Sequence, residues 1–426
     1  MISAILFISF FIFLILGIPI GICLGLSSIC AILYSGTSLT IVATNMYSGI
    51  SKFLLLAIPF FVLSGNIMAK AGISKRLIRF VDTCVGHTRG GIAIVCVIVA
   101  CFFGAISGSG PATVAALGAV LIPAMVEQGG FSAPFSTALM ATSSSIAIVI
   151  PPSIAFVVYA SITGVSIADM FMAGIVPGLL MGVALVIIVM IEAKKHNIQP
   201  SREKASAKER WDTFKDAFWG FLMPVIILGG IYGGIFTPTE AAAVSVVYGL
   251  FAGGIIYREL KWEDIKFAFA ETVRTSGRIF IVIGAAKLYT VMLTTAGFDK
   301  WVAKTMLGFS TNPTVILIMI LLIFFIVTMF MESIATLTLF MPILYPIALG
   351  VGINPIVLSV LITVVIGVGL VTPPVGMCIY VACDLMDVTV GEVFPTLVPF
   401  IAAPFVCIAL MVAFPQLILL PTYLMA

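Results

Sequence analysis

Hydroxyl side chains lie beside prolines or glycines at several places inside apolar stretches of this chain. In SSSIAIVIPPSIAFVVYA, residues 143–160, Ser143, Ser144 and Ser145 precede Pro151 and Pro152. A proline cannot donate the backbone hydrogen bond of a helix, so carbonyls near residues 147 and 148 are expected to be free. Hydroxyl and carbonyl oxygens at such a break can bind a cation such as Na⁺. Serines that only pack against a neighbouring helix are the alternative.

The only other Pro-Pro pair lies in GVGLVTPPVGMCIYVACD, residues 367–384, where Pro373 follows Pro151 by 222 positions. Gly367, Gly369 and Thr372 precede this second pair, as the serines precede the first. Glycine lets a backbone approach a ligand closely, and Thr372 supplies a hydroxyl. The pattern predicts a second cation site at a second broken helix.

The stretch SGSGPAT, residues 107–113, is too rich in glycine and proline for a helix centre and predicts a turn. Ser109 or Gly110 can cap the helix that follows, with Pro111 in its first turn. Free N–H groups at this tip could bind an anion, and the hydroxyls of Ser107, Ser109 and Thr113 could bind a cation. Close helix packing through small residues is the alternative.

One acid, Glu332, interrupts the apolar stretch FMESIATLTLFMP, residues 330–342. Placing a carboxylate at the centre of a bilayer costs roughly 3 kcal/mol on insertion scales, so a partner or a function is expected. Glu332 could balance a bound cation or accept hydrogen bonds from N–H groups at a turn. A purely structural capping role explains it equally well.

The composition places these residues in a membrane. The 426 residues are 62% hydrophobic and 9% charged, with a mean hydropathy of +1.26, whereas a soluble chain is about one quarter charged. Long apolar runs predict an all-α polytopic protein in a lipid bilayer, and we expect no nucleic-acid partner. Both histidines lie in polar loops, which argues against an intramembrane serine protease, and no phosphate-binding loop of an ATP-driven pump occurs. The eight cysteines form no CxxC pair and predict packing rather than a disulfide or metal site.

The basic residues fix a topology. Most of them fall in three clusters, at 70–89, 194–215 and 258–278, which the positive-inside rule assigns to the cytoplasm. Three apolar runs separate the first two clusters, and three crossings would place these clusters on opposite sides. The conflict disappears if 91–126, which contains the glycine-rich turn, is a re-entrant hairpin. Segments 72–86 and 258–278 are amphipathic and basic, and we expect them to lie flat on the cytoplasmic surface.

The two Pro-Pro segments belong to a longer internal repeat. AGISKRL at 71 resembles AGFDKWV at 296, and VSIADMF at 165 resembles VTVGEVF at 388, with offsets of 225 and 223. A chance match of apolar sequence is the alternative, but lysine, proline and acidic positions align as well. Five crossings separate the hairpin at 91–126 from its counterpart at 313–348, so the second enters from the opposite side. This predicts an inverted repeat, an architecture that many secondary transporters share.

The chain divides into four parts on this interpretation. The first part, 1–52, is an N-terminal membrane helix and connector, and the second, 53–192, is the first repeat with a broken helix at 135–164. The third part, 193–278, holds the basic loop, two scaffold helices and an arm helix. The fourth part, 279–426, is the second repeat with a broken helix at 355–384. The start of the chain lacks a basic region and a cleavage site and favours a retained helix. Residues 2–34 form either one tilted helix or one interrupted at Gly17–Pro19. An amphipathic arm is expected at 297–311 on the outer face. TPTE at 237–240 predicts a capping box.

Four separated motifs resemble one transporter family. GSGPATVAALGAVLIPAM, SSSIAIVIPPSIAFVVYA, GGIYGGIFTPTEAAAV and LVTPPVGMCIYVA look like the large membrane subunit of tripartite ATP-independent periplasmic (TRAP) transporters. The resemblance covers nearly the whole chain and is closest to the sialic-acid members. It implies a protein of the bacterial inner membrane that works with a small four-helix membrane subunit and a periplasmic substrate-binding protein.

The resemblance also implies a mechanism and site residues. Na⁺ would drive uptake of an organic acid, here sialic acid (N-acetylneuraminate), by an elevator movement of the hairpins and broken helices. The Na⁺ sites carried over are Ser107, Gly108, Ser109, Thr113, Ser143, Ser144, Ser145 and Pro151 in the first repeat, and Glu332, Ser333, Thr336, Gly367, Gly369, Thr372 and Pro373 in the second. The substrate would lie between the two tips, at Ser109, Gly110, Pro111, Ser145, Ser333 and Thr372. A stand-alone Na⁺-coupled carboxylate transporter or Na⁺/H⁺ antiporter of related architecture is the alternative, and a channel fits opposed hairpins less well.

Overall fold

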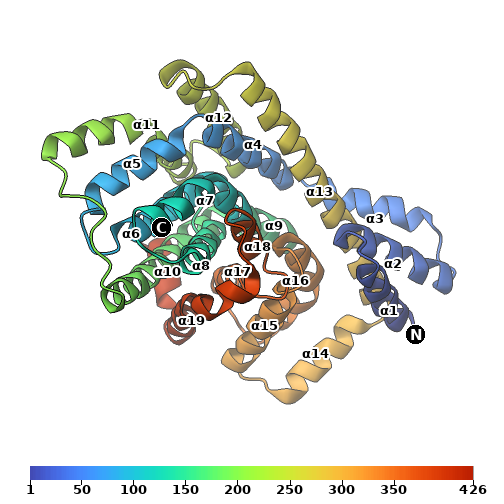
Figure 1. Cartoon of the computed structure of the whole chain (residues 1–426). Coiled ribbons are helices and arrows are strands. Elements are labelled where there is room, and N and C mark those ends of the chain that lie inside the picture. Colours follow the sequence, from blue (N-terminus) through green and yellow to red (C-terminus); the bar gives the residue numbers. More distant parts are fainter. Residues whose placement is uncertain (426) are drawn as a thin grey trace.

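The computed structural model describes residues 1–425, with the side chains of 1–423, and all regular elements of this part of the chain are helices. Its only extended pairing is an isolated bridge between Arg89 and Pro200. Eight of the described helices are long and apolar enough to cross a membrane. The prediction of an all-α polytopic protein is therefore confirmed (Figure 1).

Two series of six helices follow one another with matching spacing, and we name them unit 1 and unit 2. Unit 1 comprises α5 (Ile73–Val85), α6 (Gly91–Ser107), α7 (Gly110–Glu127), α8 (Ala133–Ser145), α9 (Ile154–Thr163) and α10 (Ile167–Lys195). Unit 2 comprises α14 (Phe298–Phe309), α15 (Pro313–Thr328), α16 (Ser333–Gly350), α17 (Pro355–Gly369), α18 (Met377–Asp384) and α19 (Val390–Ala413). Corresponding helices begin 222 to 225 residues apart, as 91 and 313 or 73 and 298 illustrate. The internal repeat is thus a property of the fold as well as of the sequence.

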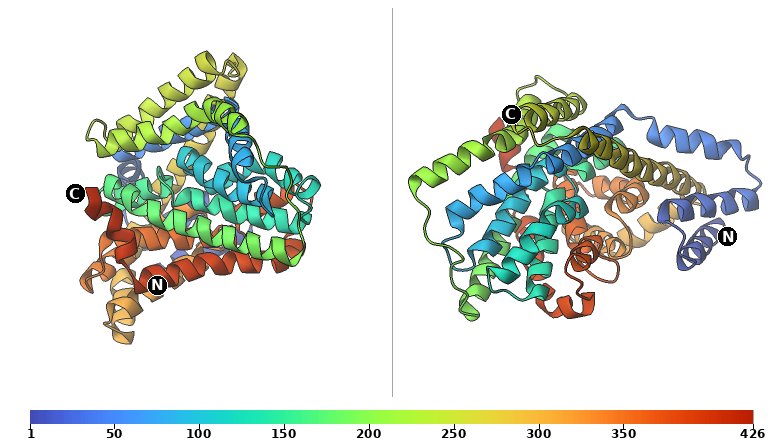
Figure 2. Two further views of the ribbon diagram at one scale, coloured as in Figure 1. Left: turned by 90° about the vertical axis from the view of Figure 1, so that its left-hand side faces the viewer. Right: turned by 45° about the horizontal axis from the view of Figure 1, so that its top comes forward.

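The two units exchange contacts reciprocally. Helix α9 packs on α16 and its counterpart α18 packs on α7, while α8 packs on α19 and α17 packs on α10. Figure 1 shows α7, α8, α9, α16, α17 and α18 gathered at the centre of the molecule, and Figure 2 shows the long helices α10 and α19 side by side. Such an exchange is what a pseudo-twofold relation between the units produces. The opposite membrane orientation of the units, and the re-entrant placement of the hairpins α6–α7 and α15–α16, stay predictions.

Equivalent caps explain why equivalent helices start where they do. Ser132 caps α8 and Asn354 caps α17, each accepting a hydrogen bond from a backbone N–H two or three residues on. Ser166 and Thr389 do the same for α10 and α19. A side-chain oxygen at the N-cap satisfies one of the backbone N–H groups that a helix leaves unpaired. The repeat therefore preserves helix starts through short polar residues embedded in apolar sequence.

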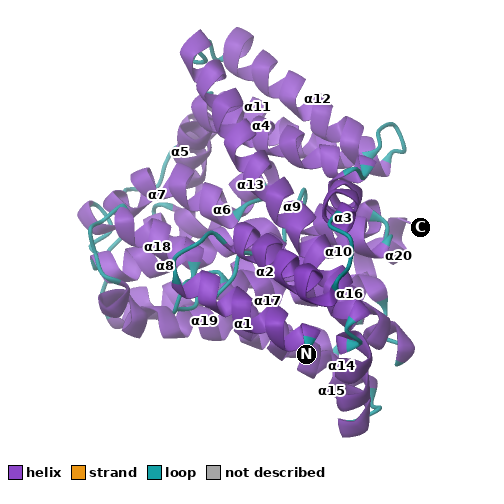
Figure 3. Cartoon of the chain, turned by 90° about the vertical axis from the view of Figure 1, so that its right-hand side faces the viewer, coloured by secondary structure: helices purple, strands orange, loops and turns teal. Residues whose placement is uncertain are grey.

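The remaining helices lie outside the paired units. They are α1 (Ile2–Ile15), α2 (Ile20–Ser35), α3 (Thr40–Ile50), the 3₁₀ turn Phe53–Leu56 leading into α4 (Ala57–Lys70), α11 (Ala207–Tyr232), α12 (Pro238–Phe251) continued by a π turn at Ala252–Ile256, α13 (Trp262–Thr295) and α20 (Gln416–Met425). Helices α2, α3 and α4 pack along α13, and α1 to α3 face the viewer in Figure 3. The predicted capping box is confirmed, because Glu240 N–H donates to Thr237 and Thr237 N–H donates to the Glu240 carboxylate.

The boundaries differ from the sequence prediction at two places, and the structure decides between two alternatives at a third. The arm expected at 258–278 is not a separate helix, because α13 continues unbroken for 34 residues from Trp262 to Thr295. A lone glycine at 277 lowers helix propensity by only about 1 kcal/mol and does not end the helix. Helix α11 begins at Ala207, inside the basic cluster at 194–215, so part of the predicted basic loop is helical. The start of the chain takes the interrupted alternative, with Gly17 in the left-handed region (φ 77°) between α1 and α2.

Candidate transport site

The tip of the first hairpin, residues 107–110, is closed by its own hydroxyl groups. The hydroxyls of Ser107 and Thr113 lie 2.8 Å apart, and Thr113 also donates to the carbonyl of Ser109 at 2.9 Å. Ser107 is 5% exposed and Thr113 is fully buried. Three of the predicted site residues therefore form one hydrogen-bonded cluster.

This tip lies directly against the break in the first broken helix, residues 146–153. Gly108 has a left-handed backbone (φ 60°), and a side chain there would place its first carbon 2.6 Å from the carbonyl oxygen of Pro152. Gly104, one turn earlier, faces Ala147 equally closely. The glycines are required here because the two backbones approach more closely than any side chain allows.

At the first break, α8 ends with three buried serines. Ser144 donates to the carbonyl of Ala141 at 2.6 Å and Ser145 donates to that of Thr142 at 2.8 Å, whereas the buried hydroxyl of Ser143 has no partner. A buried hydroxyl without a partner costs about 1–3 kcal/mol, so a ligand oxygen acceptor or a cation beside Ser143 would relieve a real penalty.

The expectation of free carbonyls near residues 147 and 148 is wrong for residue 148. The carbonyl of Ile148 is not free, because the hydroxyl of Ser153 donates to it across the Pro-Pro segment. Ser153 also accepts from the N–H of Phe156 and so caps α9. A single serine thus replaces the hydrogen bond that proline cannot donate, a repair that the proline positions alone do not reveal.

The second unit joins its tip, residues 329–332, to its break, residues 370–376, through the backbone. The N–H of Val375 donates to the carbonyl of Met329 at 2.9 Å. A side chain at Gly369 would place its first carbon 2.6 Å from Cβ of Thr328, and Thr372 donates to the carbonyl of Val368 at 2.7 Å. The second hairpin therefore contacts the second broken helix through Thr328 and Met329, and of the predicted residues Gly369 lies at this contact. An approach of Glu332, Ser333 and Thr336 to the break stays a prediction.

Glu332 occupies the N-cap position of α16, but its carboxylate does not cap the helix. Its carbonyl accepts from the N–H and the hydroxyl of Thr336, both at 3.0 Å. Glu332 and Ser333 are half-buried, and no basic side chain of the described residues lies within 4 Å of the Glu332 carboxylate. Of the roles considered from the sequence, capping of the helix by the Glu332 side chain is not observed.

The two breaks also meet each other. A side chain at Gly367 would reach to 3.2 Å from the carbonyl oxygen of Ser145, and one at Gly110 would lie 2.9 Å from the sulfur of Cys378 and 3.4 Å from the carbonyl oxygen of Ser144. Each tip therefore contacts its own break, and the first tip also contacts the second broken helix. A substrate position between the two tips stays a prediction.

The oxygens of this region are hydroxyl and carbonyl groups with a single carboxylate. Among the described residues no group of three or more His, Cys, Asp or Glu side chains could hold a metal ion. All eight cysteines are free. Neutral oxygens suit an ion that must bind weakly enough to be released, rather than a resident transition metal.

Sequence reasoning missed Ser153, Cys378 and two lysines, Lys52 and Lys287, which line a cavity between α13 and the paired units. The two lysines could have been identified from the sequence, because they are the only basic residues outside the cytoplasmic clusters and the outer arm. Nothing in the sequence marked Cys378 and Ser153, since their roles depend on contacts with Gly110 and Ile148 that only the folded chain makes.

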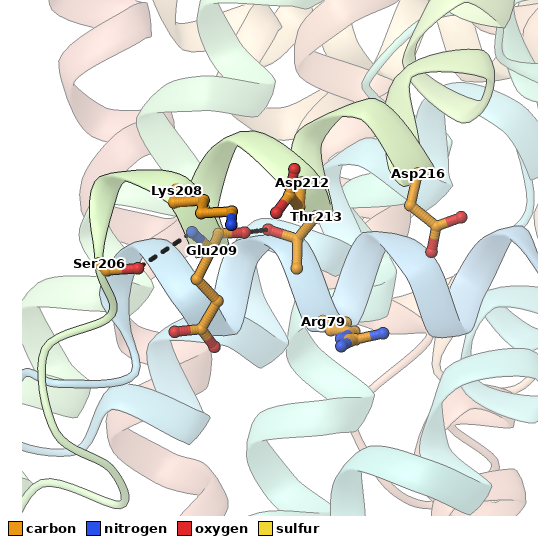
Figure 4. Close-up of a pocket in the computed structure, with 7 residues that line it drawn as sticks. All are labelled: Arg79, Ser206, Lys208, Glu209, Asp212, Thr213 and Asp216. Atoms are coloured by element: carbon orange, nitrogen blue, oxygen red, sulfur yellow. Dashed lines mark hydrogen bonds between the residues drawn. The ribbon is translucent and has the colours of Figure 1, made fainter.

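A separate hollow lies between the basic arm α5 and α11. It has a volume of about 370 Å³, and Figure 4 shows Arg79 opposite the acidic side chains of Glu209, Asp212 and Asp216. Beside it, Arg202 pairs with Asp82 at 3.0 Å and with Glu209 at 2.6 Å, and these hydrogen bonds, Glu209 first, raise the pKa of Arg202. None of the residues that line this hollow belongs to a hairpin or a break, and we assign the charges to anchoring the arm.

Comparison with known proteins gives the family. The family model described as "Tripartite ATP-independent periplasmic transporter, DctM component" matches residues 7–417. The C4-dicarboxylate TRAP transporter large permease protein DctM of Vibrio cholerae is 37% identical over 99% of this chain and 98% of its own length. The sialic acid TRAP transporter large permease protein SiaM of the same species is 35% identical over 95% of this chain and 94% of its own length.

The isethionate TRAP transporter permease protein DctMQ of Oleidesulfovibrio alaskensis is 39% identical over 93% of this chain, which spans 63% of that longer protein. Two solved structures share the fold at low identity. MtrF of Neisseria gonorrhoeae matches with a TM-score of 0.59 and 15% identity, over 88% of this chain and 83% of MtrF. The YdaH transporter of Alcanivorax borkumensis matches with a TM-score of 0.62 and 12% identity, over 88% of this chain and 86% of YdaH. The chain therefore belongs to the DctM family of large TRAP transporter permeases, and it is a multi-pass bacterial inner-membrane transport protein rather than an enzyme.

Proposed function

We propose that this chain carries Na⁺-coupled uptake of an organic acid, together with a small four-helix membrane subunit and a periplasmic substrate-binding protein. The observation that carries the proposal is the contact of each hairpin tip with its own helix break, made by Gly108 on Pro152 and by Val375 on Met329. Membership of the TRAP family supports the two partners.

Na⁺ would bind in two places, one in each unit. In unit 1 the oxygens available are the hydroxyl cluster of Ser107 and Thr113 and the serines of α8, of which Ser143 lacks a partner. In unit 2 they are Thr336, Thr372 and the Glu332 carboxylate. A cation near Glu332 would offset the charge of a half-buried carboxylate that has no basic neighbour within 4 Å.

The organic acid would bind where the tips and breaks converge, at the N–H groups of Ser109 and Gly110 beside Pro111 and at the hydroxyls of Ser145, Ser333 and Thr372. Helix N-termini favour anions, and α7 and α16 both begin at tips. The hairpins and broken helices would move as one body against α4, α11, α12 and α13, in an elevator movement. The reciprocal packing of the units supports a common moving body, since α9, α16, α7 and α18 hold one another.

The identity of the acid is the finer part of the proposal. Sialic acid was the prediction from the sequence, and it is named for one relative, whereas isethionate and C4-dicarboxylates are named for others of equal or higher identity. We therefore propose an organic acid as the class and retain sialic acid as one of three candidates to be compared directly.

The test is uptake into liposomes that contain the chain together with the small subunit and the substrate-binding protein encoded in the same genome. Labelled sialic acid, succinate and isethionate are each supplied with and without an inward Na⁺ gradient. We expect one of the three acids to accumulate, at least tenfold faster with the gradient and only with both partners present. Uptake without partners would support a stand-alone transporter instead, and uptake indifferent to Na⁺ would contradict the coupling.

A further inference from the structure

A cavity of about 270 Å³ lies between the outer helices and the paired units. Lys52, in the turn after α3, and Lys287, on α13, line one side of it, and α9 and α16 form the other. None of its lining residues is acidic. The cavity therefore concentrates two positive groups without a matching negative one.

Lys287 and Lys52 are both exposed at this cavity, but Lys287 lies in an apolar part of the chain. It lies near the middle of 279–296, the apolar half of α13, where a lysine costs roughly 3 kcal/mol on insertion scales. Its stem packs on Gly49, where any side chain would place its first carbon 3.0 Å from Cβ of Lys287. The contact fixes the stem between α3 and α13 and leaves the ammonium group at the cavity.

Lys52 reaches across to the paired units. Its ammonium group donates to the carbonyl of Ser161, in the last turn of α9, where helix carbonyls lack backbone partners. An ammonium group has three N–H donors, so this contact leaves two of them for a ligand. Neither lysine lies within 4 Å of an acidic side chain of the described residues.

We propose that this cavity binds an oxyanion, a carboxylate or a phosphate, between Lys52 and Lys287. Two ammonium groups balance the charge that such a ligand brings, and the hydroxyl of Tyr345 offers one more donor. The oxyanion is carried either by a small organic acid or by the phosphate of a lipid head group. Because Lys52 and Lys287 belong to the outer helices and Tyr345 belongs to α16, the bound ligand bridges the two parts of the molecule.

The site is distinct from the hairpin tips, so its test does not depend on Na⁺ coupling. The experiment measures how fast each lysine of the purified full chain reacts with an amine-acylating reagent, followed by peptide mass spectrometry. Lys300 and Lys304, exposed on α14, are internal controls. One arm adds succinate or inorganic phosphate in detergent, and the other compares nanodiscs of phosphatidylglycerol with nanodiscs of phosphatidylcholine.

We expect labelling of Lys52 and Lys287 to slow at least fivefold in one arm, with Lys300 and Lys304 unchanged. Slowing in the first arm identifies a soluble organic acid or phosphate, and slowing in the second identifies a lipid. The variant Lys287→Gln should remove the protection of Lys52, whereas Lys300→Gln should leave it intact. Equal labelling with and without every anion, or no labelling of either lysine in any condition, overturns the proposal.

Discussion

The two units share a backbone plan but differ in how each tip is held to its break. In unit 1 the tip closes on itself through the hydroxyls of Ser107 and Thr113, meets its break by the close approach of Gly108 to Pro152, and carries no charge. In unit 2 a backbone hydrogen bond joins Val375 to Met329, and the tip carries Glu332. The comparison shows that the repeat preserved where the helices break, while the side chains at the breaks diverged.

The arms of the two units differ as well. In unit 1, α5 is tied to its surroundings by Arg76, which pairs with Asp216 at 3.0 Å and Glu259 at 2.6 Å and lies over the ring of Tyr257. Burial alone would lower the pKa of Arg76, but hydrogen bonds to Glu259 and Asp216 outweigh it and raise the pKa. No ion pair of the described residues involves α14, the arm of unit 2. We infer that the first arm is fixed by charge and the second by apolar contacts alone.

The largest effect is expected at the closest tip-to-break contact. Gly108→Ala should reduce reconstituted uptake at least tenfold, because the new methyl group meets the Pro152 carbonyl at 2.6 Å and must push the tip from the break. Gly164→Ala is the matched control, since Gly164 also has a positive φ (76°) but nothing within 4 Å. The control should lose only the backbone preference, about 1–2 kcal/mol of stability. Equal loss of uptake in both variants would show that the contact has no special role.

A smaller effect is expected at the charged arm of unit 1. Arg76→Gln should lower the free energy of unfolding by about 1–2 kcal/mol, because two carboxylates lose a shared partner that is only 17% exposed. The measurement is thermal unfolding in detergent at low and high salt. Arg274→Gln, which removes an exposed pair at 3.6 Å, should change stability by less than about 0.5 kcal/mol. If the two variants unfold alike, charge does not anchor the first arm.

The smallest effect is a difference in stability between variants of two equivalent helix caps. Thr389 and Glu392 form a reciprocal capping box on α19, whereas Ser166 on α10 makes only the forward bond to the N–H of Asp169. Thr389→Ala and Ser166→Ala should each cost about 1 kcal/mol, with the larger loss for Thr389. Chemical denaturation measures both. The opposite order would mean that the second bond of the box adds nothing.

Local chemistry allowed much of this fold to be predicted. The Pro-Pro pairs marked both breaks, and the offset of 222 to 225 residues marked the repeat, because proline and glycine act on the backbone within one turn. The clustering of Ser107, Ser109 and Thr113 was also predictable, since these residues are near neighbours in the chain.

What the sequence could not supply depends on contacts between distant segments. The exchange of α9 and α18 between units, the approach of Gly110 to Cys378 and the cavity of Lys52 and Lys287 join residues more than a hundred positions apart. The continuity of α13 was missed for another reason. A change from basic to apolar composition within one helix resembles a boundary between two helices, although no proline ends the helix there.

The central claim is that tip and break in each unit form a Na⁺ site, and the Na⁺ concentration at half-maximal uptake tests it most directly. The variants are Ser145→Ala in unit 1 and Thr372→Ala in unit 2. The control is Ser28→Ala in α2, another fully buried serine that donates to a helix carbonyl, at 2.7 Å. We predict that the half-maximal Na⁺ concentration rises at least threefold in both site variants and stays unchanged in the control. An unchanged Na⁺ dependence in both Ser145→Ala and Thr372→Ala would contradict the placement of the sites.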